Sequence, residues 1–390
     1  MGAYSVTERG LCLRRPGQLV FVSAGGQRAV ALHFSKLTRT LVSTLKETFM
    51  KKTHLIAAAC IALSQASVYA QSGSEVNIIC SGQAPWCSMI AVTFEKSQGI
   101  KVNMTLKGSG EAVAQLMAEK ANPKTDIFFG GTGDPHLVAA EQNLTQEYKS
   151  PLLPKLYDWA QKQAAQSGYK TVGIYSGPLG FGYNTELIAK KKLPIPKTWA
   201  DLIKPEYKGE IQSANPSSSG TAYTMIATLV QLMGEDKAFD YLAKLHKNIA
   251  TYQRSGVGPI KAVARGEAAI SISFVHDGPG EKAQGFPLET ITPSDGTGAE
   301  IGSMSIVRGA RNLEAAKKFY DWALTPGAQA LGAATLQFQL PSNRETKVDP
   351  RVPDFRKIKM IDYDYAKYGQ SAERKRLIQR WERDVNGQSR

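Results

Sequence analysis

Short apolar runs alternate with longer segments of helical periodicity from residue 75 onward. Residues 75–80, 100–106 and 125–131 each contain a short apolar run next to polar residues or glycine, which is typical of strands. The segments between them, residues 84–99 and 108–121, repeat apolar side chains at the three- and four-residue spacing of helices. This order predicts an α/β fold with a mixed, mostly parallel sheet and helices on both faces.

The length of the chain favours two lobes over a single domain. The 320 residues that follow position 70 exceed an ordinary domain. Residues 151–161 and 170–184 interrupt the alternation, and we expect the first crossing between lobes there. The predicted organisation is a first lobe over residues 71–175, a second lobe over 176–296, a return to the first lobe over 297–355, and a helical tail over 356–390.

One predicted strand ends in two ionisable side chains. In SISFVHDGPG, residues 271–280, serines alternate with apolar residues up to Val275, at the period of two expected of a strand. His276 and Asp277 follow directly, and a glycine–proline–glycine then breaks the strand. These ten residues alone leave two interpretations open, a ligand contact at the sheet edge or an exposed polar loop.

Glycines and hydroxyl residues follow several other predicted strands. Parallel sheets bind ligands beyond the carboxyl ends of their strands, where helix starts offer backbone N–H groups to an anion. A single turn of this kind is ordinary turn chemistry, but four on one edge favour a small anionic ligand. The candidate ligand-binding residues in these turns are Ser81, Ser109, Gly131, Thr132, Ser217, Ser219, Gly220 and Thr221.

Residues 50–70 have the pattern of a cleavable signal peptide. Lys51 and Lys52 precede an apolar run too short to span a bilayer, and Val-Tyr-Ala ends at Ala70. The protein is therefore expected to be exported and cut after Ala70. Residues 1–49 are expected to be an unusual leader or a translation artefact, and they are excluded from the fold.

Removal of residues 1–70 changes the charge of the chain. The remainder carries 39 Lys and Arg against 32 Asp and Glu, a net charge of +7 in place of +14, so nothing demands a nucleic acid partner. The basic segment at residues 373–385 places apolar residues on one helical face. We expect an amphipathic helix that docks on the body through Leu377, Ile378, Trp381 and Val385.

Two cysteines remain after cleavage, Cys80 and Cys87. An even pair in an exported chain predicts a disulfide. Zinc would need more ligands than the three scattered histidines of the mature chain supply, so neither a metal nor another cofactor is expected. His136 follows Asp134-Pro135 at a predicted helix start, where it could simply be exposed.

Three blocks, residues 198–223, 265–274 and 306–329, resemble the periplasmic binding proteins that serve ABC importers. The branch concerned binds ferric iron, thiamine, polyamines, phosphonates and sugar phosphates. The resemblance covers residues 74–345 and implies two α/β lobes that close on a ligand. It also implies a monomer in the periplasm and an inner-membrane ABC permease as partner.

The resemblance also bears on the ligand. Ferric-binding members have two adjacent tyrosines after the strand where this chain has His276 and Asp277. The turn at Ser219 matches the place where those members hold a phosphate. Together with Glu300, expected just before the returning strand, His276 and Asp277 resemble the sugar-recognising residues of AfuA-type hexose-phosphate-binding proteins.

The implied ligand is therefore a phosphorylated sugar of the hexose 6-phosphate class. Two alternatives stay open, 2-aminoethylphosphonate, whose amine could meet the same carboxylates, and ferric iron. An enzyme is not expected, because the chain has no G-x-S-x-G elbow, P-loop or metal cluster.

Overall fold

The computed structural model describes residues 75–388, which belong to one compact unit. The expected signal peptide (50–70) and the segment upstream of it (1–49) lie outside the described residues. Within the described part, no helix is long and apolar enough to cross a membrane.

The strands of the described chain form one hydrogen-bonded network in the order β2-β1-β3-β9-β4-β7-β5-β6, with β8 and β10 also paired to β4. β1 runs parallel to β2 and β3, and β5 runs parallel to β6 and β7. The bounds are β1 Glu75–Cys80, β2 Lys101–Leu106, β3 Ile127–Phe129, β4 Val172–Asn184, β5 Ile211–Ala214, β6 Ile249–Gln253, β7 Ile270–Phe274, β8 Leu288–Ile291, β9 Ala299–Ile306 and β10 Leu340–Pro341.

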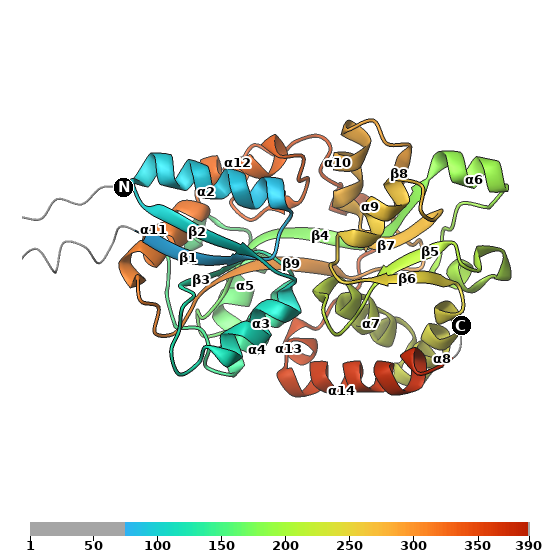
Figure 1. The fold of residues 1–390 in the computed structure, drawn as a ribbon, viewed down its shortest axis with the longest axis horizontal. Coiled ribbons are helices and arrows are strands. Elements are labelled where there is room, and N and C mark those ends of the chain that lie inside the picture. The colour runs from blue at the N-terminus through green and yellow to red at the C-terminus, as the bar shows by residue number, and fades with distance from the viewer. Residues whose placement is uncertain (1–74, 389–390) are drawn as a thin grey trace, which may run out of the picture. The chain divides into compact units, whose positions relative to one another are not determined.

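Two long strands, β4 and β9, connect the group β1–β3 with the group β5–β7 (Figure 1). β4 pairs with β9 up to Pro178 and with β7 from Leu179 onward, in both cases antiparallel. We call the part built on β1–β3 the first lobe and the part built on β5–β7 the second lobe. The two-lobed α/β architecture is confirmed, with the antiparallel pairs concentrated on the crossing strands. The residue boundaries of the lobes stay predictions.

Helices cover both faces of these strands. The helices predicted at residues 84–99 and 108–121 are present as α2 and α3. The bounds are α2 Ala84–Gln98, α3 Ser109–Ala118, α4 Gly133–Glu141, α5 Asp158–Gln166, α6 Thr185–Lys191, α7 Gly220–Met233, α8 Glu235–His246, α9 Gly258–Ala264, α10 Gly278–Ala283, α11 Leu313–Ala323, α12 Pro326–Ala334, α13 Tyr365–Tyr368 and α14 Ser371–Trp381.

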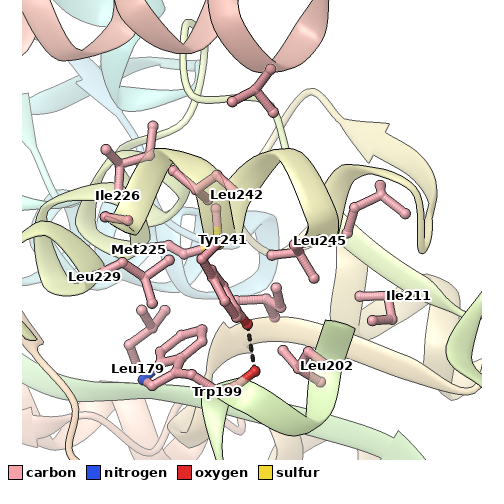
Figure 2. Close-up of a cluster of buried hydrophobic side chains, with 14 of the residues drawn as sticks. Leu179, Trp199, Leu202, Ile211, Met225, Ile226, Leu229, Tyr241, Leu242 and Leu245 are labelled. Carbon is pink, nitrogen blue, oxygen red and sulfur yellow. Dashed lines mark hydrogen bonds between the residues drawn. The ribbon is translucent and has the colours of Figure 1, made fainter. Parts of the chain in front are cut away.

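The core of the second lobe packs α7 and α8 against the sheet (Figure 2). Trp199, which is fully buried, belongs to the same cluster as Ile226 and Leu229 of α7 and Leu242 and Leu245 of α8. The Tyr241 hydroxyl donates a hydrogen bond of 2.6 Å to the Trp199 carbonyl, so the polar end of this buried tyrosine is satisfied. This core fixes the start of α7, which faces the ligand cavity described below.

The C-terminal segment docks on the body as the sequence predicted, and the structure places it on the second lobe. Leu377 and Trp381 of α14 and Val385 in the following π-helical turn are fully buried in the same core, and Ile378 is partly buried against it. Burying each such side chain contributes about 1.5–3 kcal/mol of folding free energy. α14 also contacts α4 of the first lobe, so it lies along both lobes.

Candidate functional site

A cavity of about 530 Å³ lies beyond the carboxyl ends of strands from both lobes. Its size falls in the range of small-molecule sites. Ten of the eleven ligand-binding residues predicted from the sequence line it, namely Ser81, Ser109, Gly131, Thr132, Ser219, Gly220, Thr221, His276, Asp277 and Glu300. Ser217 does not, because it points outward and its hydroxyl donates a hydrogen bond of 2.6 Å to Glu382.

Among the helices that start at this cavity are α3 and α4 from the first lobe and α7 from the second. Their starts are in direct contact, since a Cβ on Gly220 would come within 1.7 Å of Thr132 Oγ1 and 2.9 Å of Ser109 Oγ. Only glycine permits this approach. Neither Thr132 nor Ser219 caps its own helix with a side-chain hydrogen bond, so the first-turn N–H groups of α4 and α7 are not used in that way.

Hydroxyls at these turns are buried without a partner. Among the described residues, no hydrogen-bonding group meets Ser81 Oγ or Ser219 Oγ. An unsatisfied buried polar group costs about 1–3 kcal/mol and calls for an explanation. Hydroxyls and helix N-termini that converge on one cavity are donors suited to an anion such as phosphate.

A disulfide fixes one of these turns. Cys80 at the end of β1 is bonded to Cys87 in α2, which confirms the predicted pair. The turn between them carries Ser81 and Gln83, and both line the cavity. The bond therefore limits the positions available to these two side chains.

The lining of the cavity also includes two acidic residues and a histidine. His276 and Asp277 lie in a 3₁₀ turn directly after β7, are only 2% and 4% exposed, and so do not form an exposed loop. His276 Nε2 is 3.7 Å from Asp277 Oδ1 and 3.4 Å from Glu300 Oε1. Glu300 was expected just before the returning strand. It is instead the second residue of β9 and lies within that strand.

Burial controls the charge of this trio. It raises the pKa of Asp277 to about 7, although the hydrogen bond from Gln83 acts to lower that pKa. It also raises the pKa of Glu300 well above its usual range, and the negative charge of Asp277 adds to this rise. Burial lowers the pKa of His276 to about 3, so the imidazole is neutral at pH 7. Two buried carboxyl groups beside a neutral imidazole are suited to ligand groups that donate hydrogen bonds, such as sugar hydroxyls, or to a cation.

Gln83 and Tyr175 are among the cavity residues that the sequence analysis missed. Gln83 Nε2 of the first lobe donates a hydrogen bond of 3.1 Å to Asp277 Oδ1 of the second. Tyr175 of β4 accepts a hydrogen bond of 3.1 Å from the N–H of Gly131, and its ring packs onto Gly302, where a Cβ would come within 2.0 Å of Cζ. A tyrosine in the strand that crosses between lobes was a usable signal, because such a strand must pass the cleft.

At the edge of the cavity Arg254 forms an ion pair with Glu111 of α3, and its side chain is 82% exposed. His136, for which an exposed position was one interpretation, is fully buried. Its Nδ1 lies 2.8 Å from Ser305 Oγ, its Nε2 lies 3.0 Å from the Gly130 carbonyl, and its ring stacks on Phe128. That interpretation is wrong, because α4 turns the imidazole toward the sheet. Within residues 75–388, no group of three or more His, Cys, Asp or Glu side chains is arranged to hold a metal ion.

Comparisons with known proteins agree with this geometry. A sequence model of the family described as bacterial extracellular solute-binding protein matches residues 122–368. The structure is similar to that of the periplasmic binding protein AfuA of Actinobacillus pleuropneumoniae with fructose-6-phosphate bound. The TM-score is 0.79 and the identity 44%, over 80% of this chain and 99% of AfuA.

Two further similarities extend the comparison. An uncharacterised protein of Haemophilus influenzae is 43% identical over 79% of this chain and 90% of its own length. Iron-bound HitA of Pseudomonas aeruginosa has a TM-score of 0.67 at 20% identity, over 78% of this chain and 98% of HitA, which shows a shared fold alone.

Proposed function

Because the chain belongs to the bacterial extracellular solute-binding protein family, we propose that it captures a phosphorylated sugar in the periplasm. The ligand class is a hexose 6-phosphate, and the partner that receives it is an inner-membrane ABC permease. Proteins of this kind are transport components and not enzymes.

The observation that supports this ligand most strongly is that the cavity lining combines two kinds of groups. The first comprises the starts of α3, α4 and α7, with the unpartnered hydroxyls of Ser81 and Ser219 beside them. The second comprises Asp277 and Glu300, whose carboxyl oxygens lie 3.7 and 3.4 Å from His276 Nε2. A molecule with a phosphate at one end and hydroxyl groups at the other meets both requirements. The similarity to AfuA, whose structure holds fructose-6-phosphate, points the same way.

A phosphonate with a cationic amine is the second candidate, and one observation favours it. Asp277 and Glu300 are two buried carboxyl groups that form no ion pair with a lysine or arginine among the described residues, and an ammonium group would neutralise them. Ferric iron is less well supported. The cavity has one tyrosine, Tyr175, in place of the adjacent pair, and its hydroxyl already accepts a hydrogen bond from Gly131.

Titration calorimetry on the purified protein tests the proposal. We expect tight binding of fructose 6-phosphate or glucose 6-phosphate and no measurable binding of the unphosphorylated sugars. Equal affinity for fructose and its phosphate would contradict it. Tighter binding of 2-aminoethylphosphonate would replace it with the second candidate. Incubation with glucose 6-phosphate should release no inorganic phosphate, whereas a phosphatase would release it.

A further inference from the structure

Arg374 of α14 lies behind the helix starts that face the cavity. The residue is 9% exposed, and its Nη1 donates to Oδ2 of Asp134, itself 7% exposed. The Arg374 Cζ also lies 4.4 Å from the centre of the Tyr223 ring. A buried guanidinium thus touches one residue of each lobe.

Both contacts belong to the first turns of helices that start at the cavity. Asp134 is the second residue of α4, two positions after Thr132, and Tyr223 is the fourth residue of α7, four positions after Ser219. Thr132 and Ser219 line the cavity, whereas Asp134, Tyr223 and Arg374 do not. The guanidinium therefore joins the two helix starts on the side away from the ligand.

The charge of Asp134 makes this contact relevant to an anion. A carboxylate in the first turn of α4 occupies the positive end of the helix, which a phosphate at the cavity would also use. Burial raises the pKa of Asp134, and the positive charge of Arg374 acts against that rise. The field of Asp134 reaches the acidic residues of the site as well, since it is among the charges that raise the pKa of Glu300.

α14 is placed to transmit lobe closure. Beyond Arg374 the helix belongs to the second lobe, through the buried Trp381 and through the ion pairs of Arg376 and Arg380 with Glu235 of α8. Its first residue, Ser371, donates its N–H to Glu141 of the first lobe at 2.6 Å. Separation of the lobes would break the contacts of α14 with α4 while those with α8 persist.

We propose that Arg374 is a positioning residue for ligand capture, which neutralises Asp134 and holds the starts of α4 and α7 together from behind the cavity. The proposal deepens the proposed function and rests on it for the anionic ligand. It assigns to the C-terminal helix a part in setting both affinity and closure.

The test compares Arg374→Gln with the double variant Asp134→Asn/Arg374→Gln. The first variant leaves Asp134 buried without its cation. Its affinity for fructose 6-phosphate, measured by calorimetry, should fall about tenfold or more. The second removes the carboxylate as well and should bring the affinity back to within about threefold of wild type. A purely structural role for Arg374 predicts no such recovery, so a double variant as weak as the single one would overturn the proposal.

Arg376→Gln is the matched control. It makes the same change of charge two residues later on α14, but its ion pairs are with Glu235 and Glu373 and it does not reach the first lobe. Its affinity should stay within about twofold of wild type. An equal loss in Arg376→Gln and Arg374→Gln would also overturn the proposal. Melting temperatures of all variants identify any that fail to fold, and Arg374→Lys, which keeps the charge, should then lose less affinity than Arg374→Gln.

A second measurement needs no ligand and separates this inference from the proposed function. Spin labels on cysteines placed at the exposed Ala118 of α3 and Ala189 of α6 report the distance between lobes. In the ligand-free protein, Arg374→Gln should enlarge the population at long distance and Arg376→Gln should not. An unchanged distribution in Arg374→Gln would overturn the proposal. If the wild type binds neither fructose 6-phosphate nor inorganic phosphate, the proposed function is wrong. The distances between the spin labels still decide the role of Arg374 in that case.

Discussion

The ring of His276 occupies the space that a side chain at Gly177 would need. A Cβ on Gly177 would come within 1.9 Å of His276 Nδ1, far inside any real contact. Gly177 lies on β4 and pairs directly with Glu300 on β9, whose carboxyl group is 3.4 Å from the same imidazole. The two crossing strands thus place His276 and Glu300 relative to each other.

Gly177→Ala should therefore displace the imidazole and weaken hexose 6-phosphate binding by about tenfold or more. It should also lower the free energy of unfolding, because overpacking typically costs about 1–3 kcal/mol of stability. Calorimetry and a melting curve measure both effects. Gly327→Ala is the control, since Gly327 lies in α12 and a methyl group added there would meet no atom within 4 Å other than its chain neighbours and the backbone of its own helix. It should leave affinity unchanged and raise stability by up to about 1 kcal/mol. Unaltered affinity in Gly177→Ala would contradict the packing argument.

The stability of the ligand-free protein should depend on pH through Asp277. Its folded pKa of about 7 lies above the value of about 3.9 in an unfolded chain. The contribution of the Asp277 carboxyl group to folding stability is therefore fully present below pH 4 and is lost as the pH rises through 7.

Asp277→Asn removes that dependence. The gain in stability over wild type should be near zero at pH 4, grow between pH 4 and 7, and then level off at up to about 4 kcal/mol. Chemical denaturation at several pH values measures it. A difference that is constant with pH would show that the carboxyl group is not desolvated in solution.

The two kinds of groups in the cavity lining should respond differently to substitution. Thr221→Val removes a hydroxyl at the start of α7 and should weaken every phosphorylated ligand by a similar factor, since hydrogen bonds to a charged group contribute about 1.5–3 kcal/mol. Asp277→Ala should strongly lower the affinity for hexose phosphates. It should leave the affinity for inorganic phosphate unchanged or raise it, because a like charge is removed. If Asp277→Ala keeps hexose phosphate affinity within twofold, sugar recognition lies elsewhere in the cavity.

Loss of the disulfide should destabilise the protein and lower its affinity for the ligand. Cys80→Ser/Cys87→Ser opens a short loop, for which chain-entropy models give about 2–3 kcal/mol. The turn with Ser81 and Gln83 would gain freedom, so affinity should fall as well. Thiol titration of the wild type should find no reactive thiol until reductant is added, and a thiol that reacts beforehand would contradict the assignment.

The mature protein should begin at Gln71. The Val-Tyr-Ala sequence before it predicts signal peptidase cleavage after Ala70. Intact mass of protein from the periplasm measures this directly. A mass that includes residues 1–70, or a lipid adduct at Cys60, would be inconsistent with the prediction.

The sequence was informative wherever the cavity is built from neighbouring residues. A strand, a glycine and hydroxyl turn, and a helix start follow one another within a few residues, so Ser81, Thr132 and Ser219 could be predicted to meet at one edge of the sheet, and they line the cavity. Ser217 belonged to such a turn yet points outward, because only one side of a turn can face the cavity.

The residues that escaped prediction reach the site from distant segments. Tyr175 comes from a strand without an obvious turn, and Gln83 acquires its role only through Asp277, 194 residues later. Arg374 looked like one charge among many on an amphipathic helix. Its burial depends on Asp134 and Tyr223, which lie far away in the sequence. Such contacts become visible only once the lobes are assembled.

The pairing of Pro178 with Ala299 has a consequence for protein engineering. The chain leaves the first lobe and returns to it at neighbouring residues, so the second lobe is topologically an insertion with adjacent ends. Exchange of this segment between relatives would therefore need two junctions that lie side by side. A transplant of residues 179–298 alone would nevertheless be incomplete, because Leu377, Trp381 and Val385 fill its core from the far end of the chain. A working chimera has to take both pieces from the same parent.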